Sequence, residues 1–469
     1  MSIPPFGSLA GEVLRAGVVA VAVLAVLAFA EIWRSRWSPE VETTRKAVHL
    51  SIGIIGMALP WLLSSVITLL VLIVPVLILF VIARRRGWLR SVLDVERSSL
   101  GDLLFPISVL ILFVIGRGDR VFYLIAMFSL VACDTLAAVL GKAYGRHSYV
   151  VEGDSKSFEG SAVFLLTAFL GVHLPLLLLT DIGRAESVII SLQLALLVTS
   201  FEALSGGGWD NLFVPLGTFY LLHKLTTKSV DDITIQLFAQ LLLLSISLLV
   251  AKVTRVLTFS GALAVHLVLY AAFSLGEPGW VIATMLALIA FVSLENLTSR
   301  VTGAARGGYQ VRTIFYLAAV AVVLIFADNT RGIIWGDGSH LVDAHPFRVP
   351  FVGALAASLS AAAYMQFAAF DGLQSSRLKR GIAGVLFGLL VVAPLGFAYT
   401  GDFRLEAFAI VAAMSVASVL LVRLGRLVLK WPRDTERDLR LVAFSVLIAS
   451  VSVFPLHMWW LNGPGLQTP

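Results

Sequence analysis

An uncharged apolar run decides the fold class of this chain. Residues 66–83 read VITLLVLIVPVLILFVIA, and residues 84–86 read RRR. About 20 consecutive apolar residues suffice for a helix to cross the hydrocarbon core of a bilayer. Similar runs recur along the 469 residues, of which 58% are hydrophobic and only 14% charged. Because a soluble protein has about a quarter charged residues, the composition excludes a water-soluble enzyme. It predicts an all-α polytopic membrane protein with about 14–16 membrane segments.

Lys and Arg are distributed unevenly between the predicted loops of the first half. Cytoplasmic loops of membrane proteins carry an excess of these residues. With the amino terminus outside, the inside loops carry twelve of them and the outside loops three. We therefore expect an integral protein of a bacterial inner membrane whose functional site faces the cytoplasm. The inside set is Arg34, Arg36, Arg45, Lys46, Arg84, Arg85, Arg86, Arg90, Arg97, Lys142, Arg146 and Lys156, and the outside set is Arg117, Arg120 and Arg184.

Charge and cysteine content narrow the choice of partners. The formal net charge of +6 resides in short loops between apolar runs, which favours anionic lipid headgroups and a phosphate-bearing substrate and not nucleic acid. A single cysteine, Cys133, excludes an intramolecular disulfide. A polar hinge at His223, Lys224 and Lys228 separates two predicted domains, residues 1–230 and 231–469. The oligomeric state is left open.

Four ionisable residues lie at the ends of predicted spans. Such groups are costly at membrane depth unless they are paired, hydrated or used in function. His49 begins the second span, Asp134 lies in the last turns of the fifth, and Glu202 ends the seventh. Asp210, followed by Asn211, opens the short segment after it. In the predicted topology all four meet at the cytoplasmic face, so we expect them to form one site.

The residues from Asp134 to Gly160 suit the binding of a nucleoside triphosphate. Residues 134–146 read DTLAAVLGKAYGR, and residues 154–161 read DSKSFEGS. Glycines allow backbone amides to approach phosphates closely, and an acid can hold magnesium. The start of the next helix adds a positive dipole end. The candidates are Gly141, Lys142, Gly145, Arg146, Gly153, Lys156, Ser157, Glu159 and Gly160, with Asp134 for the metal.

The same residues also have simpler explanations. Lys142 and Arg146 in a cytoplasmic loop can act as topology determinants. Glycines in loops usually form turns. Asp134 can form an ion pair with a neighbouring basic residue. The density of the cluster, which includes an acid within the membrane, favours the functional interpretation.

A second glycine-rich cluster runs from Glu202 to Pro215 and reads EALSGGGWDNLFVP. Three successive glycines between two acids allow the backbone to approach a ligand, and Asp210 with Asn211 offers the oxygen ligands that magnesium prefers. A flexible turn capped by Asp210 is the alternative. A third cluster, Arg45-Lys46-Ala-Val-His49, can anchor a helix end or contact substrate.

Together these motifs resemble the CTP-dependent lipid-alcohol kinases, which include the dolichol and phytol kinases and have the CDP-diacylglycerol synthases as distant relatives. The resemblance covers residues 40–225. Its motifs, in order, are Arg45-Lys46 with His49, residues 97–102 (RSSLGD), residues 134–145, residues 156–160 (KSFEG), and residues 202–215 ending in Asp210-Asn211 and Pro215. The Asp210-Asn211 pair is similar to the kinase branch, whereas the cytidylyltransferase branch is expected to have an aspartate-arginine pair there.

The resemblance implies roles for these positions. Lys142, Arg146 and Lys156, with Ser157 and Gly160, would bind the phosphates of CTP. Asp134 and Asp210 would hold Mg²⁺ or act as the general base, and His49 and Glu202 are further candidates for the base. The implied reaction is in-line transfer of the terminal phosphoryl group to a long isoprenoid alcohol in the membrane.

Two other functions are weighed against this one. A cytidylyltransferase would release pyrophosphate and form a CDP-lipid. A proton-coupled transporter would use His49, Asp134 and Glu202 as a proton path and place ionisable residues near mid-bilayer. The second half faintly resembles phytyl-phosphate kinases at residues 258–264 and 310–312, but it lacks a second nucleotide loop, and a structural or lipid-binding role is favoured.

Overall fold

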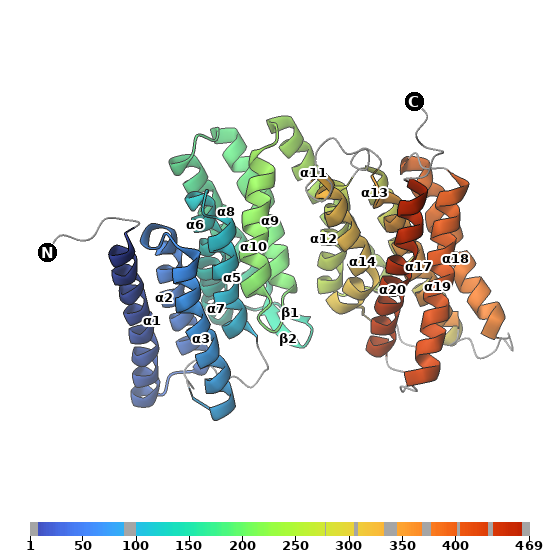
Figure 1. Cartoon of the computed structure of the whole chain (residues 1–469). Helices are drawn as coiled ribbons and strands as arrows, with labels where there is room; N and C mark the ends of the chain where they lie inside the picture. Colours follow the sequence, from blue (N-terminus) through green and yellow to red (C-terminus); the bar gives the residue numbers. More distant parts are fainter. Residues whose placement is uncertain are drawn as a thin grey trace. The chain divides into compact units, whose positions relative to one another are not determined.

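The structure, a computed structural model, describes residues 8–88, 100–276, 278–303, 308–332, 345–367, 377–400, 404–429 and 435–461. Arg90 and Arg97 of the predicted topology, and residues 97–99 of the second motif, lie outside this part. The chain forms two compact units, Met1–Leu237 and Phe238–Pro469. Both are built from long helices (Figure 1). The prediction of an all-α polytopic membrane protein is confirmed.

Eleven helices of the described part are long and apolar enough to cross a membrane. This is fewer than the 14–16 segments expected from the apolar runs. Helix α2 (Val41–Leu62) begins with charged residues, while α5 (Gly101–Ile115) and α12 (Phe259–Leu275) are apolar but short. Charged helix ends and short helices lower the number because crossing requires about 20 apolar residues.

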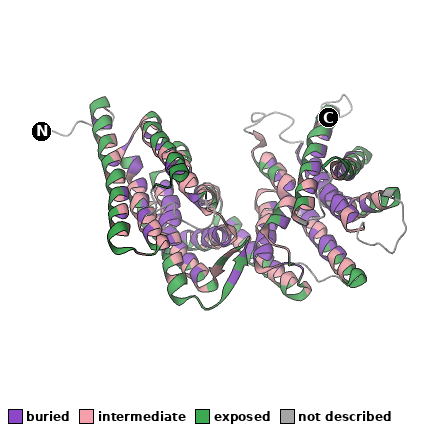
Figure 2. Ribbon diagram, turned by 90° about the horizontal axis from the view of Figure 1, so that it is seen from below, coloured by how far each residue is buried: buried purple, intermediate pink, exposed green. Residues whose placement is uncertain are grey.

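Besides α2 and α5, ten further elements lie wholly within the described residues of the first unit. Exposed residues lie mainly on the outer faces of its helices and buried residues on the inner faces (Figure 2), and many of the exposed residues are large and apolar. On α1, for example, Val21 is 67% exposed whereas Leu27 is buried, as expected for a helix with one face toward lipid. The elements are α1 (Leu9–Trp37), α3 (Val66–Arg86), α6 (Arg120–Phe128), η1 (Ser129–Cys133), α7 (Asp134–Tyr144), β1 (Ser148–Val151), β2 (Asp154–Ser157), α8 (Phe158–Leu179), α9 (Arg184–Leu204) and α10 (Asp210–Thr226).

A short β-hairpin, which the sequence analysis did not predict, joins α7 to α8 (Figure 1). Strand β1 pairs antiparallel with β2, with Val151 opposite Asp154. The two-residue turn between them has positive φ at both Glu152 (51°) and Gly153 (93°), the backbone of a tight hairpin turn. Tyr149 and Val151 are buried, and the residues between and before them are exposed, which is the alternation of a strand with one covered face.

Polar contacts join the helices of the first unit at the end opposite the hairpin. The Glu12 carboxylate, near the start of α1, accepts hydrogen bonds from the backbone N–H groups of Ser64 and Ser65, both at 2.9 Å. Its α1 neighbour Arg15 donates to the Leu62 carbonyl at 2.7 Å. These contacts fix the start of α1 against the loop between α2 and α3.

Helix α10 extends beyond the short apolar run seen in the sequence and spans 17 residues. It begins at Asp210, beside the hairpin end of the unit, and near its last turn His223 lies 3.2 Å from Asp119 in the loop between α5 and α6. The last turn of α10 therefore lies beside the loop between α5 and α6, although α10 is not among the eleven helices long and apolar enough to cross a membrane.

The second unit is organised around α17 (Arg348–Phe367), which is buried along most of its length. Its run of Ala, Ser and Gly lets neighbouring helices approach closely, as is common between membrane helices. Around it, the described residues of this unit form α12 together with α13 (Pro278–Thr302), α14 (Val311–Asn329), α18 (Arg377–Thr400), α19 (Leu405–Leu429) and α20 (Thr435–Leu461). Helix α11 (Val230–Thr254) contains the boundary between the two units.

Candidate active site

A cavity of about 570 Å³ lies inside the first unit. Its polar end is formed by α2, α7, the hairpin, the start of α8, the end of α9 and the start of α10. Twelve of the predicted site residues line it: Arg45, Lys46, His49, Asp134, Gly141, Lys142, Lys156, Ser157, Gly160, Glu202, Asp210 and Asn211. The structure thus brings together residues that lie up to 166 positions apart, from Arg45 to Asn211.

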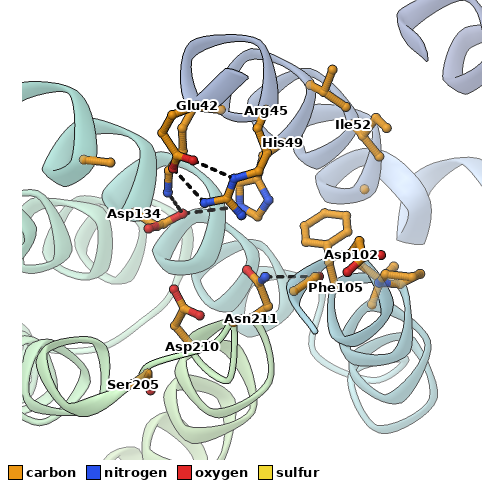
Figure 3. Close-up of a pocket in the computed structure, with 18 of the residues that line it drawn as sticks. Glu42, Arg45, His49, Ile52, Asp102, Phe105, Asp134, Ser205, Asp210 and Asn211 are labelled. Carbon is orange, nitrogen blue, oxygen red and sulfur yellow. Dashed lines mark hydrogen bonds and ion pairs between the residues drawn. The ribbon is translucent and has the colours of Figure 1, made fainter. Parts of the chain in front are cut away.

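Asp134 occupies the centre of the polar end (Figure 3). Lys46 donates to its Oδ2 at 2.6 Å, and His49 Nε2 lies 3.7 Å from the same oxygen. All three side chains are between 12% and 14% exposed. A carboxylate paired with a lysine is held in its ionised form, so Asp134 is available here as a hydrogen-bond acceptor.

A π-helical turn directly before Asp134 shapes this arrangement. The helix from Arg120 to Tyr144 is continuous, but the segment η1 adopts the wider π form. Such turns free a backbone carbonyl and are frequent at functional sites. His49 Nε2 lies 3.3 Å from the Leu130 carbonyl in this turn.

Helix α2 reaches the π turn because of Gly53. A Cβ atom at this position would lie 2.4 Å from both methyl carbons of Val131, a distance that real Cβ atoms do not adopt. The glycine therefore permits the close helix approach that positions Lys46 and His49 beside Asp134.

A second ion pair closes the polar end. Lys156 of β2 donates to Glu202 Oε1 at 2.7 Å and also to the Glu202 backbone carbonyl. Burial would lower the pKa of the Lys156 ammonium, but the carboxylates of Glu202 and Asp210 outweigh it and raise this pKa above its usual value. Lys156 is thus a fixed cation at neutral pH.

The glycine-rich loop between α9 and α10 is held by backbone contacts. Gly207 donates to Asp154 Oδ2 at 3.3 Å, and its carbonyl accepts from the N–H of Leu100 at 2.8 Å. Gly207 and Gly208 have φ values of 63° and 88°, a region that favours glycine. The loop therefore links the hairpin to the start of α5.

Asp210 and Asn211 begin α10 and serve different purposes. The Asn211 amide donates to the Gly101 carbonyl at 3.1 Å and is buried, so it holds α5 in place. Within the described residues, the Asp210 carboxylate has no hydrogen bond or ion pair, although it lines the cavity (Figure 3). Asp210 is therefore the acid of this cluster that is available to a ligand.

The predicted phosphate-binding glycines also pack α7 against α8. A Cβ at Gly141 would lie 2.9 Å from Ser157 Oγ and 3.0 Å from Gly160 Cα. The Gly160 N–H donates to Ser157 Oγ at 3.1 Å, so Ser157 caps α8 and already uses this amide.

Four of the predicted residues do not line the cavity: Gly145, Arg146, Gly153 and Glu159. Glu159 turns away to His147, whose Nδ1 lies 2.8 Å from its carboxylate. Arg146 is exposed. Lys142 lines the cavity but pairs with the exposed Glu40.

Several lining residues were given no role from the sequence. Asp102, in the second motif, accepts from Arg84 at 2.6 Å, and its place beside a cavity could have been suspected from that motif. The apolar walls away from the polar end form what we call the apolar limb, which no motif indicates. It is lined by Val19, Val23, Leu27, Val48, Ile52, Ile55, Gly56, Leu59, Leu69, Leu72, Ile73, Val76, Phe80, Phe105, Pro106 and Val109.

No group of three or more His, Cys, Asp or Glu side chains in the described residues is arranged to hold a metal ion. Magnesium is usually held by one or two carboxylates together with substrate phosphates. The donor set at the polar end, with Asp210 available and Asp134 nearby, fits that mode of binding.

Comparisons with known proteins support one family. No family model matches the chain, and no solved structure matches it. The chain is 30% identical over 207 residues to the phytol kinase of Synechocystis sp. (strain ATCC 27184 / PCC 6803 / Kazusa), a match that covers 44% of this chain and 88% of that protein. This chain is therefore an integral membrane protein and belongs to the phytol kinase family of lipid-alcohol kinases.

Proposed function

We propose that this protein transfers the terminal phosphoryl group of CTP to the hydroxyl group of an isoprenoid alcohol of the phytol type. The observation that carries the proposal is a single cavity with a charged end and an apolar limb. Such a cavity suits a reaction between a polar nucleotide and a lipid. The similarity to a phytol kinase supports the same reaction class.

The nucleotide side of the site is formed by cations and backbone. Lys156, with its raised pKa, supplies a fixed positive charge for the phosphates, and Arg45 adds a second one at the same end of the cavity. Positive charge of this kind stabilises the charge on a transferring phosphoryl group.

Asp210 would hold the Mg²⁺ that accompanies the nucleotide. A bound magnesium ion neutralises charge on the phosphate oxygens. The fit rests on the Asp210 carboxylate, which lines the cavity and makes no hydrogen bond or ion pair with the described residues, although its charge acts on Lys156.

Asp134 would accept the proton of the alcohol. Glu202 is engaged by Lys156, and Asp210 is assigned to the metal. Asp134, held ionised by Lys46, lies beside His49. The His49 ring packs against Phe105 of the apolar limb, with 4.8 Å between the two ring centroids. An alcohol whose chain lies in the limb therefore presents its hydroxyl group to Asp134 and His49. An aspartate that receives a substrate hydroxyl proton is also the arrangement of protein kinases.

We place this site at the cytoplasmic face of a bacterial inner membrane. The end of the first unit that carries the polar residues also carries Arg34, Arg45, Lys46, Arg84 and Lys142, and cytoplasmic ends are rich in such residues. CTP is a cytosolic nucleotide, so this orientation gives the site access to it.

The test uses the purified full-length protein in detergent or nanodiscs with CTP labelled in the γ-phosphate, Mg²⁺ and a panel of lipid alcohols that includes phytol, a polyprenol and diacylglycerol. We expect label in a lipid monophosphate and release of CDP, with ATP as a poorer donor. Release of pyrophosphate with a CDP-lipid would instead assign the cytidylyltransferase reaction. Absence of any nucleotide turnover would refute the proposal and leave a transporter as the alternative.

A further inference from the structure

The apolar limb is continuous with the polar end of the cavity and is lined by four helices that each turn one face toward it. On α1 the lining residues Val19, Val23 and Leu27 are spaced four apart, which places them on one helical face. On α3 the lining residues Leu69, Leu72, Ile73, Val76 and Phe80 follow the three- and four-residue spacing of one helical face. The limb is therefore a built space between helices and not a gap at one residue.

We propose that the limb binds the hydrocarbon chain of the acceptor alcohol and selects its length, an inference that rests on the proposed kinase function. The occupant is a single isoprenoid chain whose hydroxyl group lies at His49 and Asp134. The edge-to-face contact of His49 with Phe105 marks the junction at which the lining changes from polar to apolar (Figure 3).

The depth of the limb follows from the helices that line it. On α2 it extends from His49 to Leu59, ten residues and hence ~15 Å at 1.5 Å per residue. On α3 the lining from Leu69 to Phe80 gives about the same depth. The hydrocarbon core of a bilayer is ~30 Å thick, so the limb accommodates a chain about as long as one leaflet.

This depth favours a phytol-type alcohol over a long polyprenol. A chain of one leaflet's length is contained within the limb, whereas a long polyprenol would extend beyond Leu59 and gain no further contacts there. Beyond Leu59 the chain of α2 leads to Ser64 and Ser65, whose backbone N–H groups donate to Glu12, and an apolar chain cannot replace these contacts without leaving hydrogen-bonding groups unsatisfied. Catalytic efficiency should therefore rise with chain length and then reach a plateau.

The experiment narrows the limb without touching the polar end. Val23→Trp on α1 and Val76→Trp on α3 each place an indole in the limb. The matched controls are Val21→Trp and Val71→Trp, because both side chains are 67% exposed on the outer faces of the same helices. The full-length protein is assayed with CTP and the C5, C10, C15 and C20 isoprenoid alcohols, and kcat/KM is measured for each.

For the limb variants we expect kcat/KM for the C20 alcohol to fall on the order of tenfold or more, with the C5 value within about twofold of the unsubstituted protein. The controls should behave as the unsubstituted protein at every length. An equal loss at all lengths, or no loss at C20 in either limb variant, would overturn the proposal. Retained activity on the C5 alcohol also shows that a variant is folded.

A second measurement separates this proposal from the proposed reaction. A C20 alcohol that carries a photoreactive diazirine at the end of its chain is cross-linked to the full-length protein, and the labelled peptides are mapped. Labelling of α1 and α3 that phytol suppresses supports chain binding even if no phosphorylation is found. Labelling that only phospholipid suppresses would show that the limb holds a membrane lipid, and the proposal would be wrong.

Discussion

Replacing Lys156 by Met removes the cation that pairs with Glu202 at the polar end of the cavity. If Lys156 binds the CTP phosphates, its loss raises the KM for CTP. A hydrogen bond to a charged group contributes about 1.5–3 kcal/mol, which corresponds to a roughly 10- to 150-fold higher KM at 1.36 kcal/mol per tenfold change.

The same substitution also has a cost in stability. It leaves the Glu202 carboxylate, 2.7 Å from the lost ammonium and only 12% exposed, without its cation. Removing one partner of a buried ion pair destabilises a protein by about 3–5 kcal/mol. We therefore expect a lower melting temperature for Lys156→Met and partial recovery in the double variant Lys156→Met/Glu202→Gln.

Glu202→Gln is the control that separates the two effects. It keeps Lys156 and frees the ammonium from its ion pair, so the KM for CTP should stay the same or fall. The assays are steady-state kinetics with varied CTP and thermal unfolding of the purified protein. If Lys156→Met leaves the KM for CTP within twofold, or if Glu202→Gln raises the KM as much as Lys156→Met does, Lys156 is a structural residue and not a phosphate ligand.

Three further changes test the remaining parts of the site. Asp134→Asn should lower kcat by about 10²- to 10⁴-fold while membrane insertion stays intact, because a general base contributes that much; near-normal kcat would remove Asp134 from the mechanism. Chelation by EDTA should abolish activity and added Mg²⁺ restore it, with Asp210→Asn requiring a higher Mg²⁺ concentration for half-maximal rate; an unchanged requirement would argue against Asp210 as the ligand. Gly141→Val should lower the melting temperature, since even a Cβ would lie 2.9 Å from Ser157 Oγ. The control Gly17→Val should not lower it, because nothing lies within 4 Å of a Cβ at that position. Equal melting temperatures for the two variants would show that α7 and α8 can separate.

The polar end of the site could be anticipated from residues far apart in the sequence. His49, Asp134, Glu202 and Asp210 each lie at the end of an apolar run, and the count of Lys and Arg placed those ends on the same side. The structure brings all four to one cavity. Their catalytic roles stay predictions.

Other features of the site had weak or no local signals. The π turn before Asp134 and the approach of α2 through Gly53 depend on how two distant helices pack. The hairpin was missed although Glu152-Gly153 is a two-residue turn between short strands, because four-residue strands are too short to show a periodic pattern against long apolar helices. Glu159 and Arg146 were predicted to bind phosphate together with their neighbours in sequence, yet Glu159 pairs with His147, Arg146 is exposed, and neither residue lines the cavity.

The fold class was determined by the sequence alone, because partition into a bilayer depends on the length and composition of each run, which are local properties. Which apolar residues face lipid and which face the limb was decided only by the tertiary structure. Lipid tails are as apolar as Leu or Val side chains, so Val21 on the outer face and Val23 in the limb are indistinguishable until the helices α1, α2, α3 and α5 are packed together.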